Sequence, residues 1–253
     1  MCTVLISFGQ FAELPLFLAA NRDEMFDRPS EPPRKRSAGA GHWIGPRDLR
    51  AGGTWVGVND HGLIAVITNR SDLGPGAHST PPRSRGQLVR GVLEQTTVEA
   101  AVDRVQADSA EPSEPFNLAF GTVDALWIAR RDHEAFALES AAPGLHLLSN
   151  FGRPNDRTVA EVERGHREWN EKSLTAAAVW SRAPEILAVG PGASGEAGLT
   201  KHHEGRGTVS SSVIGIASDG SVRYLHADGP PDRTPFREIP TFTLPAPPLD
   251  GSR

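Results

Sequence analysis

Short apolar runs separated by turn residues open the chain. Thr3–Phe8 is apolar and rich in β-branched residues, which is typical of a buried strand. Pro15–Ala20 is a second apolar run, and the segment between the two, Gly9–Leu14, includes a glycine. This pattern predicts a β-hairpin at the start of the chain.

The spacing of this hairpin brings the first thiol of the chain to a polar cluster. A turn centred just before Ala12 places Cys2 opposite Asn21 in the neighbouring strand. Arg22 and Asp23 follow directly in sequence. We therefore expect Cys2 to meet polar and charged side chains at the open end of the hairpin.

The rest of the chain alternates groups of strands with groups of helices. Further strands are predicted at Thr54–Val58, Leu63–Thr68, Phe116–Thr122, Leu126–Arg130, Ala135–Leu138, Leu145–Ser149, Val209–Ala217 and Val222–Ala227. Helices are predicted at Arg85–Glu94, Val98–Ala107, Asp156–Lys172 and Ala183–Val189, and irregular loops at Arg28–Gly53, Ser71–Pro82 and Gly190–Gly207. Hairpins without repeated βαβ units indicate an α+β sandwich, in which helices cover two stacked, mostly antiparallel sheets.

Composition narrows the class of protein. With 38% hydrophobic and 23% charged residues, the 253-residue chain can bury a sizeable core. The net charge of −5 argues against an overall basic nucleic-acid-binding protein, and no apolar run approaches the roughly 18 residues of a membrane span. The single cysteine excludes an internal disulfide and a multi-cysteine zinc site, so a reducing, cytoplasmic setting is expected. No metal is expected, since His202-His203 lacks an evident third ligand.

The position of the only cysteine suggests a nucleophile. Removal of Met1 would leave Cys2 with a free α-amine, a group whose ordinary pKa is about 7.7–8.0, beside a thiol of about 8.5. The amine could then serve as the general base for the thiol of its own residue. Arg22 beside the thiol would favour the thiolate. The alternative is that a cysteine at the second position has no function.

Three polar motifs at strand ends offer further candidates. Asn21-Arg22-Asp23-Glu24 is either a solvated turn or part of a site. Asn69 and Asn150 end two other predicted strands, where each side chain either initiates a turn or donates to an oxyanion. The glycines of Gly52-Gly53-Thr54-Trp55-Val56-Gly57 serve either turns or the close approach of a ligand to the backbone.

Taken in order, these motifs resemble the NRDE family, also called the transport and Golgi organisation protein 2 family. The resemblance runs from residue 1 to about 227 and rests on Met1-Cys2-Thr3, Ala20-Asn21-Arg22-Asp23-Glu24, the Gly52–Gly57 motif, Gly62-Leu63-x-Ala65-x-x-Thr68-Asn69-Arg70 and Leu148-Ser149-Asn150. It implies a four-layer αββα sandwich like that of the N-terminal nucleophile hydrolases. A single domain over residues 1–229 and a Pro-rich tail over 230–253 are expected.

The resemblance also implies roles for individual residues. By analogy with cholylglycine hydrolase and penicillin V acylase, Cys2 is the nucleophile and Asp23 lies near its α-amine. Arg22 lowers the thiol pKa or holds an anionic substrate group, and Asn69 or Asn150 stabilises the oxyanion. Substrate binding is assigned to Asn21, Trp55 and Arg70.

Two functions follow from this resemblance. One is hydrolysis of a non-peptide amide (C–N) bond in a small molecule, with no resident cofactor. The other is binding or trafficking of haem or an acyl ligand on the same fold without hydrolysis. In that case the long loop Arg28–Gly53, with Trp43 and Trp55 nearby, would line an apolar pocket.

Overall fold

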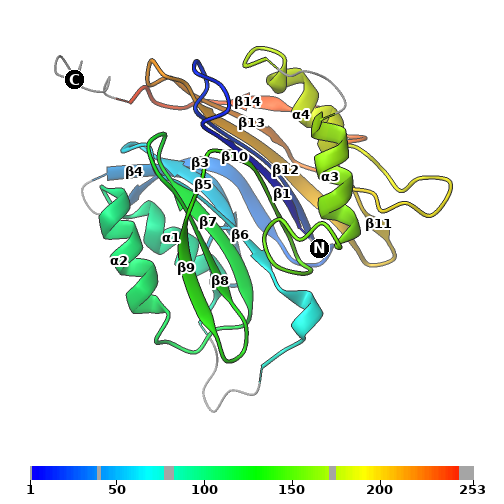
Figure 1. Ribbon diagram of the computed structural model, residues 1–253, viewed down its shortest axis with the longest axis horizontal. Coiled ribbons are helices and arrows are strands. Elements are labelled where there is room, and N and C mark those ends of the chain that lie inside the picture. Colours follow the sequence, from blue (N-terminus) through cyan, green and yellow to red (C-terminus); the bar gives the residue numbers. More distant parts are fainter. Residues whose placement is uncertain (1, 39–40, 77–82, 171–174, 245–253) are drawn as a thin grey trace.

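Two antiparallel sheets stacked face to face form the centre of the molecule (Figure 1). The computed structural model describes residues 2–38, 41–76, 83–170 and 175–244. The first sheet contains β1 (Thr3–Phe8), β2 (Leu16–Met25), β10 (Gly144–Ser149), β11 (His202–His203), β12 (Arg206–Ile216), β13 (Val222–Ala227) and β14 (Arg237–Ile239). The second contains β3 (Ser30–Ala38), β4 (Gly41–Asp48), β5 (Val56–Asn59), β6 (Ile64–Asn69), β7 (Phe116–Gly121), β8 (Leu126–Arg131) and β9 (Phe136–Ala141).

Helices cover the outer face of each sheet. The helices of the described residues are η1 (Ser71–Leu73), α1 (Arg85–Leu93), α2 (Val98–Asp108), α3 (Ala160–Asn170) and α4 (Val179–Leu187). Helices α1 and α2 share a hydrophobic cluster with the second sheet, and α3 and α4 share another with the first. The α+β sandwich expected from the sequence is thereby confirmed.

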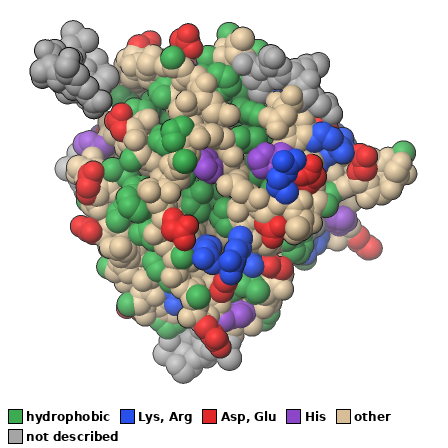
Figure 2. Space-filling model, viewed as in Figure 1, with side chains coloured by type: hydrophobic (Ala, Val, Ile, Leu, Met, Phe, Trp, Pro, Cys, Tyr) green, Lys and Arg blue, Asp and Glu red, His purple; other side chains and the backbone are tan. Residues whose placement is uncertain are grey.

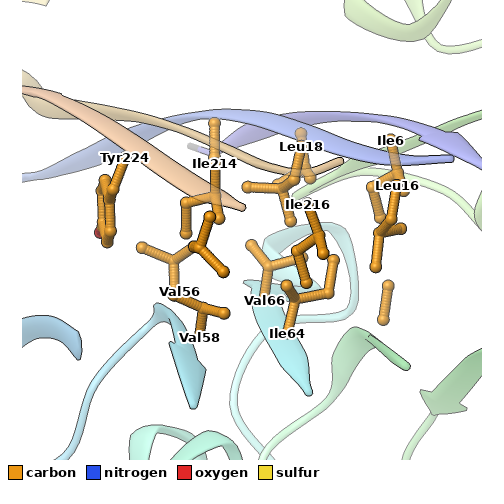
Figure 3. Close-up of a cluster of buried hydrophobic side chains, with 14 of the residues drawn as sticks. Ile6, Leu16, Leu18, Val56, Val58, Ile64, Val66, Ile214, Ile216 and Tyr224 are labelled. Carbon is orange, nitrogen blue, oxygen red and sulfur yellow. The ribbon is translucent and has the colours of Figure 1, made fainter. Parts of the chain in front are cut away.

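A third hydrophobic cluster lies between the two sheets. Figure 3 shows side chains of the first sheet, such as Leu18 and Ile214, facing Val56 and Val66 of the second. These residues alternate along their strands with residues that face the helices. The strict two-residue period of a strand therefore decides which layer each side chain enters.

The register of the first hairpin differs by one residue from the sequence prediction. Thr3, not Cys2, pairs with Asn21, so Cys2 precedes the ladder opposite Arg22. Gly9 has a positive φ of 62°, and its N–H donates to Pro15 O at 2.7 Å, which closes a longer loop than expected. A one-residue shift moves every side chain to the other face of the sheet. Asn21 therefore lies on the same face of the sheet as Thr3, and not on the face of Cys2.

The prediction of an irregular loop over Arg28–Gly53 is wrong. The segment forms strands β3 and β4, which pair with each other. Strand β3 is at the edge of its sheet, and its register shifts between Glu31 and Arg34, at Pro32 and Pro33. Proline is tolerated at such edges and bulges because no ladder hydrogen bond is required of it there. Because of these prolines, the sequence pattern predicts a loop where strand β3 forms.

Part of the C-terminal segment also belongs to the fold. Arg237–Ile239 forms β14 and pairs with β13, and Ile239 joins the cluster between the sheets. Residues 245–253 lie outside the described part of the chain, as do 77–82 of a predicted loop and 171–172 of a predicted helix. The division into a domain over 1–229 and a tail stays a prediction.

Charged side chains of both signs are interspersed on the surface. Figure 2 shows one face, on which Lys and Arg side chains lie beside Asp and Glu side chains. Among the residues that the structure describes, no helix combines the length and the apolar character needed to cross a bilayer.

A buried histidine makes the stability of this fold depend on pH. His226, in β13, is 1% exposed, and its Nδ1 lies 3.0 Å from Ser212 Oγ. Burial lowers the pKa of His226 to about 4, against about 6.5 for an exposed histidine. As the pH falls from about 6.5 towards 4, the histidine of the unfolded chain takes up a proton before that of the folded protein. The contribution of His226 to the free energy of unfolding is therefore full above this pH range and falls by about 2 kcal/mol between roughly pH 7 and 4.5.

We expect His226→Gln to remove this part of the pH dependence. Urea unfolding at neutral and acidic pH measures it, as the difference between the losses of the wild type and the variant. His203→Gln, at an exposed position of β11, serves as the control and should behave as the wild type. Equal losses in the wild type and His226→Gln would contradict the prediction.

Candidate active site

A cavity of about 270 Å³ lies where the predicted polar motifs meet. Its lining includes Cys2, which precedes β1, and Arg22 and Asp23 of β2. Even-numbered residues of β1 and β2 face the other sheet, as Val4 and Leu18 do. Because Cys2 and Arg22 continue that alternation, their side chains lie at the end of the space between the sheets.

Cys2 is held by hydrogen bonds at its backbone nitrogen and at its thiol. Its N–H donates to Asn150 Oδ1 at 2.8 Å, and the backbone of Asp23 hydrogen-bonds to its thiol. Burial raises the pKa of the Cys2 thiol, and the Asp23 carboxylate acts in the same direction, whereas Arg22 lowers it. The resting thiol is therefore protonated near neutral pH, and a base is needed to activate it.

Arg22 is fixed in place by contacts that leave its charge unneutralised. Its guanidinium carbon lies 4.0 Å from the centroid of the Trp55 ring, and Nη1 donates to Ser30 Oγ at 3.1 Å. The residue is 5% exposed, and burial lowers its pKa while Glu24 and Cys2 raise it. Stacking on an aromatic face orients a guanidinium without removing its charge. Arg22 can thus stabilise a thiolate at Cys2.

Asp23 is supported from behind by a buried network. Its Oδ1 accepts a hydrogen bond of 2.6 Å from Thr208 Oγ1, which itself accepts one of 2.9 Å from the N–H of Lys201. Lys201 Nζ pairs with Glu161 Oε1 at 2.8 Å. Burial raises the pKa of Asp23, and Thr208 and Lys201 oppose that rise. The network fixes the carboxyl group beside Cys2.

The two asparagines predicted for the oxyanion have different surroundings. Asn150 uses its side-chain oxygen on the N–H of Cys2, and its Nδ2 lies 3.4 Å from Ser71 Oγ. Asn69, at the end of β6, lines the cavity, and its amide has no hydrogen-bond partner in the described part of the chain. Asn69 is therefore the asparagine whose donor is available to a bound molecule.

The structure does not bring Asn21, which the sequence analysis assigned to substrate binding, to the cavity of Cys2. Its side chain is 2% exposed and donates to Leu187 O at 2.9 Å and Leu199 O at 3.0 Å. Its Oδ1 accepts a hydrogen bond of 2.6 Å from Ser211 Oγ. The observed register turns Asn21 toward the helix layer, away from Cys2. Asn21 holds the segment before β11 and the end of α4 against the first sheet.

Because Asn21 is structural, its replacement should affect stability. Asn21→Ala removes three buried hydrogen bonds, two to the carbonyl groups of Leu187 and Leu199 and one from Ser211, so we expect the free energy of unfolding to fall by about 3 kcal/mol. Ser211→Ala removes one hydrogen bond and should cost about 1 kcal/mol. Urea unfolding measures both. A loss under about 0.5 kcal/mol for Asn21→Ala would show that these contacts are not formed.

Arg70 is likewise occupied by structural partners. It makes two hydrogen bonds of 2.8 Å to the Asp72 carboxylate and one of 3.1 Å to Asp132. Both carboxylates raise its pKa. Arg70 lines a second cavity of about 360 Å³ and not the one that contains Cys2. The structure therefore does not bring Arg70, which the sequence analysis assigned to substrate binding, to the cavity of Cys2.

In the Gly52–Gly57 motif, Gly53 has a structural role and Trp55 lines the cavity. A Cβ on Gly53 would lie 2.4 Å from the carbonyl carbon of Gly86, so Gly53 is required by the start of α1, not by a ligand. Trp55 lines the cavity and carries Arg22. Trp43 is 4% exposed and packs in the cluster beneath α1 and α2. Trp43 therefore does not line the cavity that Trp55 lines.

Several cavity residues were missed by the sequence analysis. Arg85 and Ser84 come from the start of α1, Arg28 and Asp48 form an ion pair of 2.7 Å at the rim, and Thr208 supports Asp23. The feature of the sequence that could have indicated Arg85 was a basic residue at the start of a predicted helix. A cation is unfavourable at that end of a helix.

Comparison with solved structures places this arrangement in a known fold. The chain resembles a Caenorhabditis elegans orthologue of N-acylethanolamine-hydrolyzing acid amidase, with a TM-score of 0.56 and 13% identity, covering 84% of this chain and 92% of that one. Penicillin V acylase from Agrobacterium tumefaciens gives 0.55 and 12%, covering 97% and 100%. A variant of conjugated bile acid hydrolase from Clostridium perfringens gives 0.53 and 11%, covering 98% and 100%. At such identities the likeness establishes the fold alone.

Sequence comparison identifies the family. No curated protein matches the chain. A family profile described as Transport and Golgi organisation 2 matches residues 1–186, which is most of the sequence. The match includes Cys2, the Asn21-Arg22-Asp23-Glu24 motif, Asn69 and Asn150. The chain therefore belongs to the Transport and Golgi organisation 2 family.

Proposed function

We propose that the protein is an N-terminal cysteine amidohydrolase that cleaves a non-peptide amide bond in a small molecule. The observation that carries the proposal is the placement of Cys2, whose nitrogen contacts Asn150 and which lines one cavity together with Arg22 and Asp23. The nucleophile Cys2, the cation Arg22 and the free amide donor Asn69 then line the same cavity. The amide-cleaving relatives in the fold give the proposal a precedent.

The first half of the reaction forms a thioester. Removal of Met1 frees the α-amine of Cys2, which accepts the thiol proton as sulfur attacks the amide carbonyl. Asn69 donates to the developing oxyanion, and Arg22 stabilises the thiolate. When the tetrahedral intermediate collapses, the C–N bond breaks and the α-ammonium returns its proton to the leaving amine.

The second half regenerates the thiol. The neutral α-amine takes a proton from water as the water oxygen attacks the thioester carbonyl. The C–S bond then breaks, the carboxylic acid leaves, and the proton returns to the sulfur of Cys2. Asn150 and Asp23 have the same task in both halves, which is to hold the amine beside the sulfur.

Intact mass and turnover together test the proposal. The protein is produced with its native N-terminus, weighed, and incubated with a panel of N-acyl amides and penicillin V. We expect a mass lower by one methionine residue and release of an amine from at least one amide. The matched control carries an alanine inserted between Met1 and Cys2, which keeps the thiol and blocks its amine.

The inserted alanine separates the amine mechanism from a simple reactive thiol. It should abolish turnover while the thiol still reacts with iodoacetamide. Equal turnover in the two proteins would exclude the α-amine as the base. Processed protein that cleaves no amide of the panel, yet binds haem or an acyl ligand saturably, would favour the carrier function instead.

A further inference from the structure

The cavity that contains Cys2 borders the second cavity. The two are lined in common by Asn69, Arg85 and Glu114. Their volumes are about 270 and 360 Å³, so together they offer more room than the space around the sulfur alone. Arg85 and Asn69, whose side-chain amide has no hydrogen-bond partner in the described residues, thus line both cavities.

Arg85 and Arg22 differ from the other arginines that surround these cavities, which form ion pairs. Arg28 pairs with Asp48, Arg83 with Asp108, and Arg70 with two aspartates. The guanidinium of Arg22 is stacked on Trp55 and bonded to Ser30, whereas Arg85 has no aromatic contact among the described residues. Within the described part of the chain, Arg85 has no carboxylate within 4.0 Å, and its Nη1 donates only to Pro115 O, at 3.2 Å. Its guanidinium thus keeps donors that face the cavities.

The local electrostatics around Arg85 favour an additional anion. Burial lowers its pKa, and Glu114, which lies beyond ion-pair distance, is the strongest opposing charge. Arg85 begins α1, whose first turn holds no acidic residue and whose N-cap, Ser84, makes no side-chain capping bond. A partly buried cation at the positive end of a helix dipole is unfavourable unless an anion joins it.

We propose that Arg85 binds an anionic oxygen group of the substrate, so that the amide cleaved at Cys2 carries a carboxylate, sulfonate or phosphate near its scissile bond. A planar guanidinium matches such groups through paired hydrogen bonds. Asn69 would then contact the carbonyl oxygen and Arg85 the anion of one ligand. That the bound anion belongs to a substrate rests on the proposed amidohydrolase function. The anion site itself does not require turnover.

The single cysteine provides a test that is independent of hydrolysis. Iodoacetate and iodoacetamide have nearly the same size and differ in charge, and both can alkylate only Cys2 among the side-chain thiols. Alkylation rates with each reagent are followed by intact mass. In Arg85→Gln we expect the ratio of the iodoacetate rate to the iodoacetamide rate to fall about tenfold, as one charge-assisted contact is lost.

Two further variants keep the test decisive. Arg83→Gln removes the same charge from the same cavity lining at an ion-paired position, and its rate ratio should stay within about twofold of the wild type. Arg85→Lys keeps the charge and should recover most of the ratio. An unchanged ratio in Arg85→Gln, or an equal fall in Arg83→Gln, would overturn the anion site. Absence of amide turnover would overturn the proposed function and leave this readout intact.

Discussion

Replacing Cys2 with alanine is expected to abolish amide hydrolysis, with a fall in kcat/KM of about 10⁴-fold or more. Cys2 is the only cysteine of the chain, and the proposed reaction uses no other nucleophile of the protein. The alanine variant keeps the α-amine, so it separates the role of the sulfur from that of the base. Release of the amine product from the best amide of the panel measures the effect.

Serine at the same position provides the matched control. Cys2→Ser keeps a small nucleophile with a free amine, but the higher pKa of a hydroxyl makes it a weaker one, and we expect a loss of about 10²–10³-fold. Both variants should unfold at the wild-type urea concentration, because Cys2 lies at the cavity and not in a hydrophobic cluster. Full activity in Cys2→Ala would remove the basis of the proposed mechanism.

Replacing Asn69 with alanine should lower kcat by about 10²–10³-fold, which is the usual effect of losing one oxyanion donor. KM should change little, because the contact strengthens only as negative charge develops on the carbonyl oxygen. Asn69→Asp should be at least as slow, since a carboxylate cannot donate and repels the oxyanion. Steady-state kinetics on one neutral amide measures both variants.

Asn150 gives the contrasting pattern. Its side-chain oxygen contacts the nitrogen of Cys2, so Asn150→Ala should disturb the base and not the oxyanion. We therefore expect the acid limb of the pH–rate profile to move in Asn150→Ala, while Asn69→Ala lowers the profile without moving it. The same shift in both variants would mean that the two asparagines do not have separate roles.

Much of this architecture could be predicted from the hydrophobic pattern. The apolar runs Thr3–Phe8 and Pro15–Ala20 and the turn signals between later strands indicated antiparallel hairpins, and these are observed. The meeting of Cys2 with Arg22 and Asp23 also followed from the hairpin, since an error of one residue in the turn still leaves these side chains within reach. Local periodicity is thus sufficient where neighbouring strands are consecutive.

The errors at the candidate site have a common physical origin in contacts between distant segments. Asn21 was assigned to the site because the sequence cannot fix a register to one residue, and its partners, Leu187 and Leu199, are far along the chain. Arg85 was missed because its neighbourhood is created by the packing of Gly86 on Gly53. Hairpin rules contain no information about either contact.

The position of β1 within its sheet also determines when the reactive group can be assembled. Strand β1 lies between β2 and β10, and β2 in turn pairs with β12. A ribosome adding about 5–20 residues per second needs on the order of 10 s to reach the residues of β10. During that interval the first strand has only one of its neighbours, so an aminopeptidase has access to the chain start before the sheet closes over it. Trimming and folding thus compete in time, and under the proposed mechanism a fusion partner placed ahead of Cys2 would keep its α-amine blocked and prevent turnover.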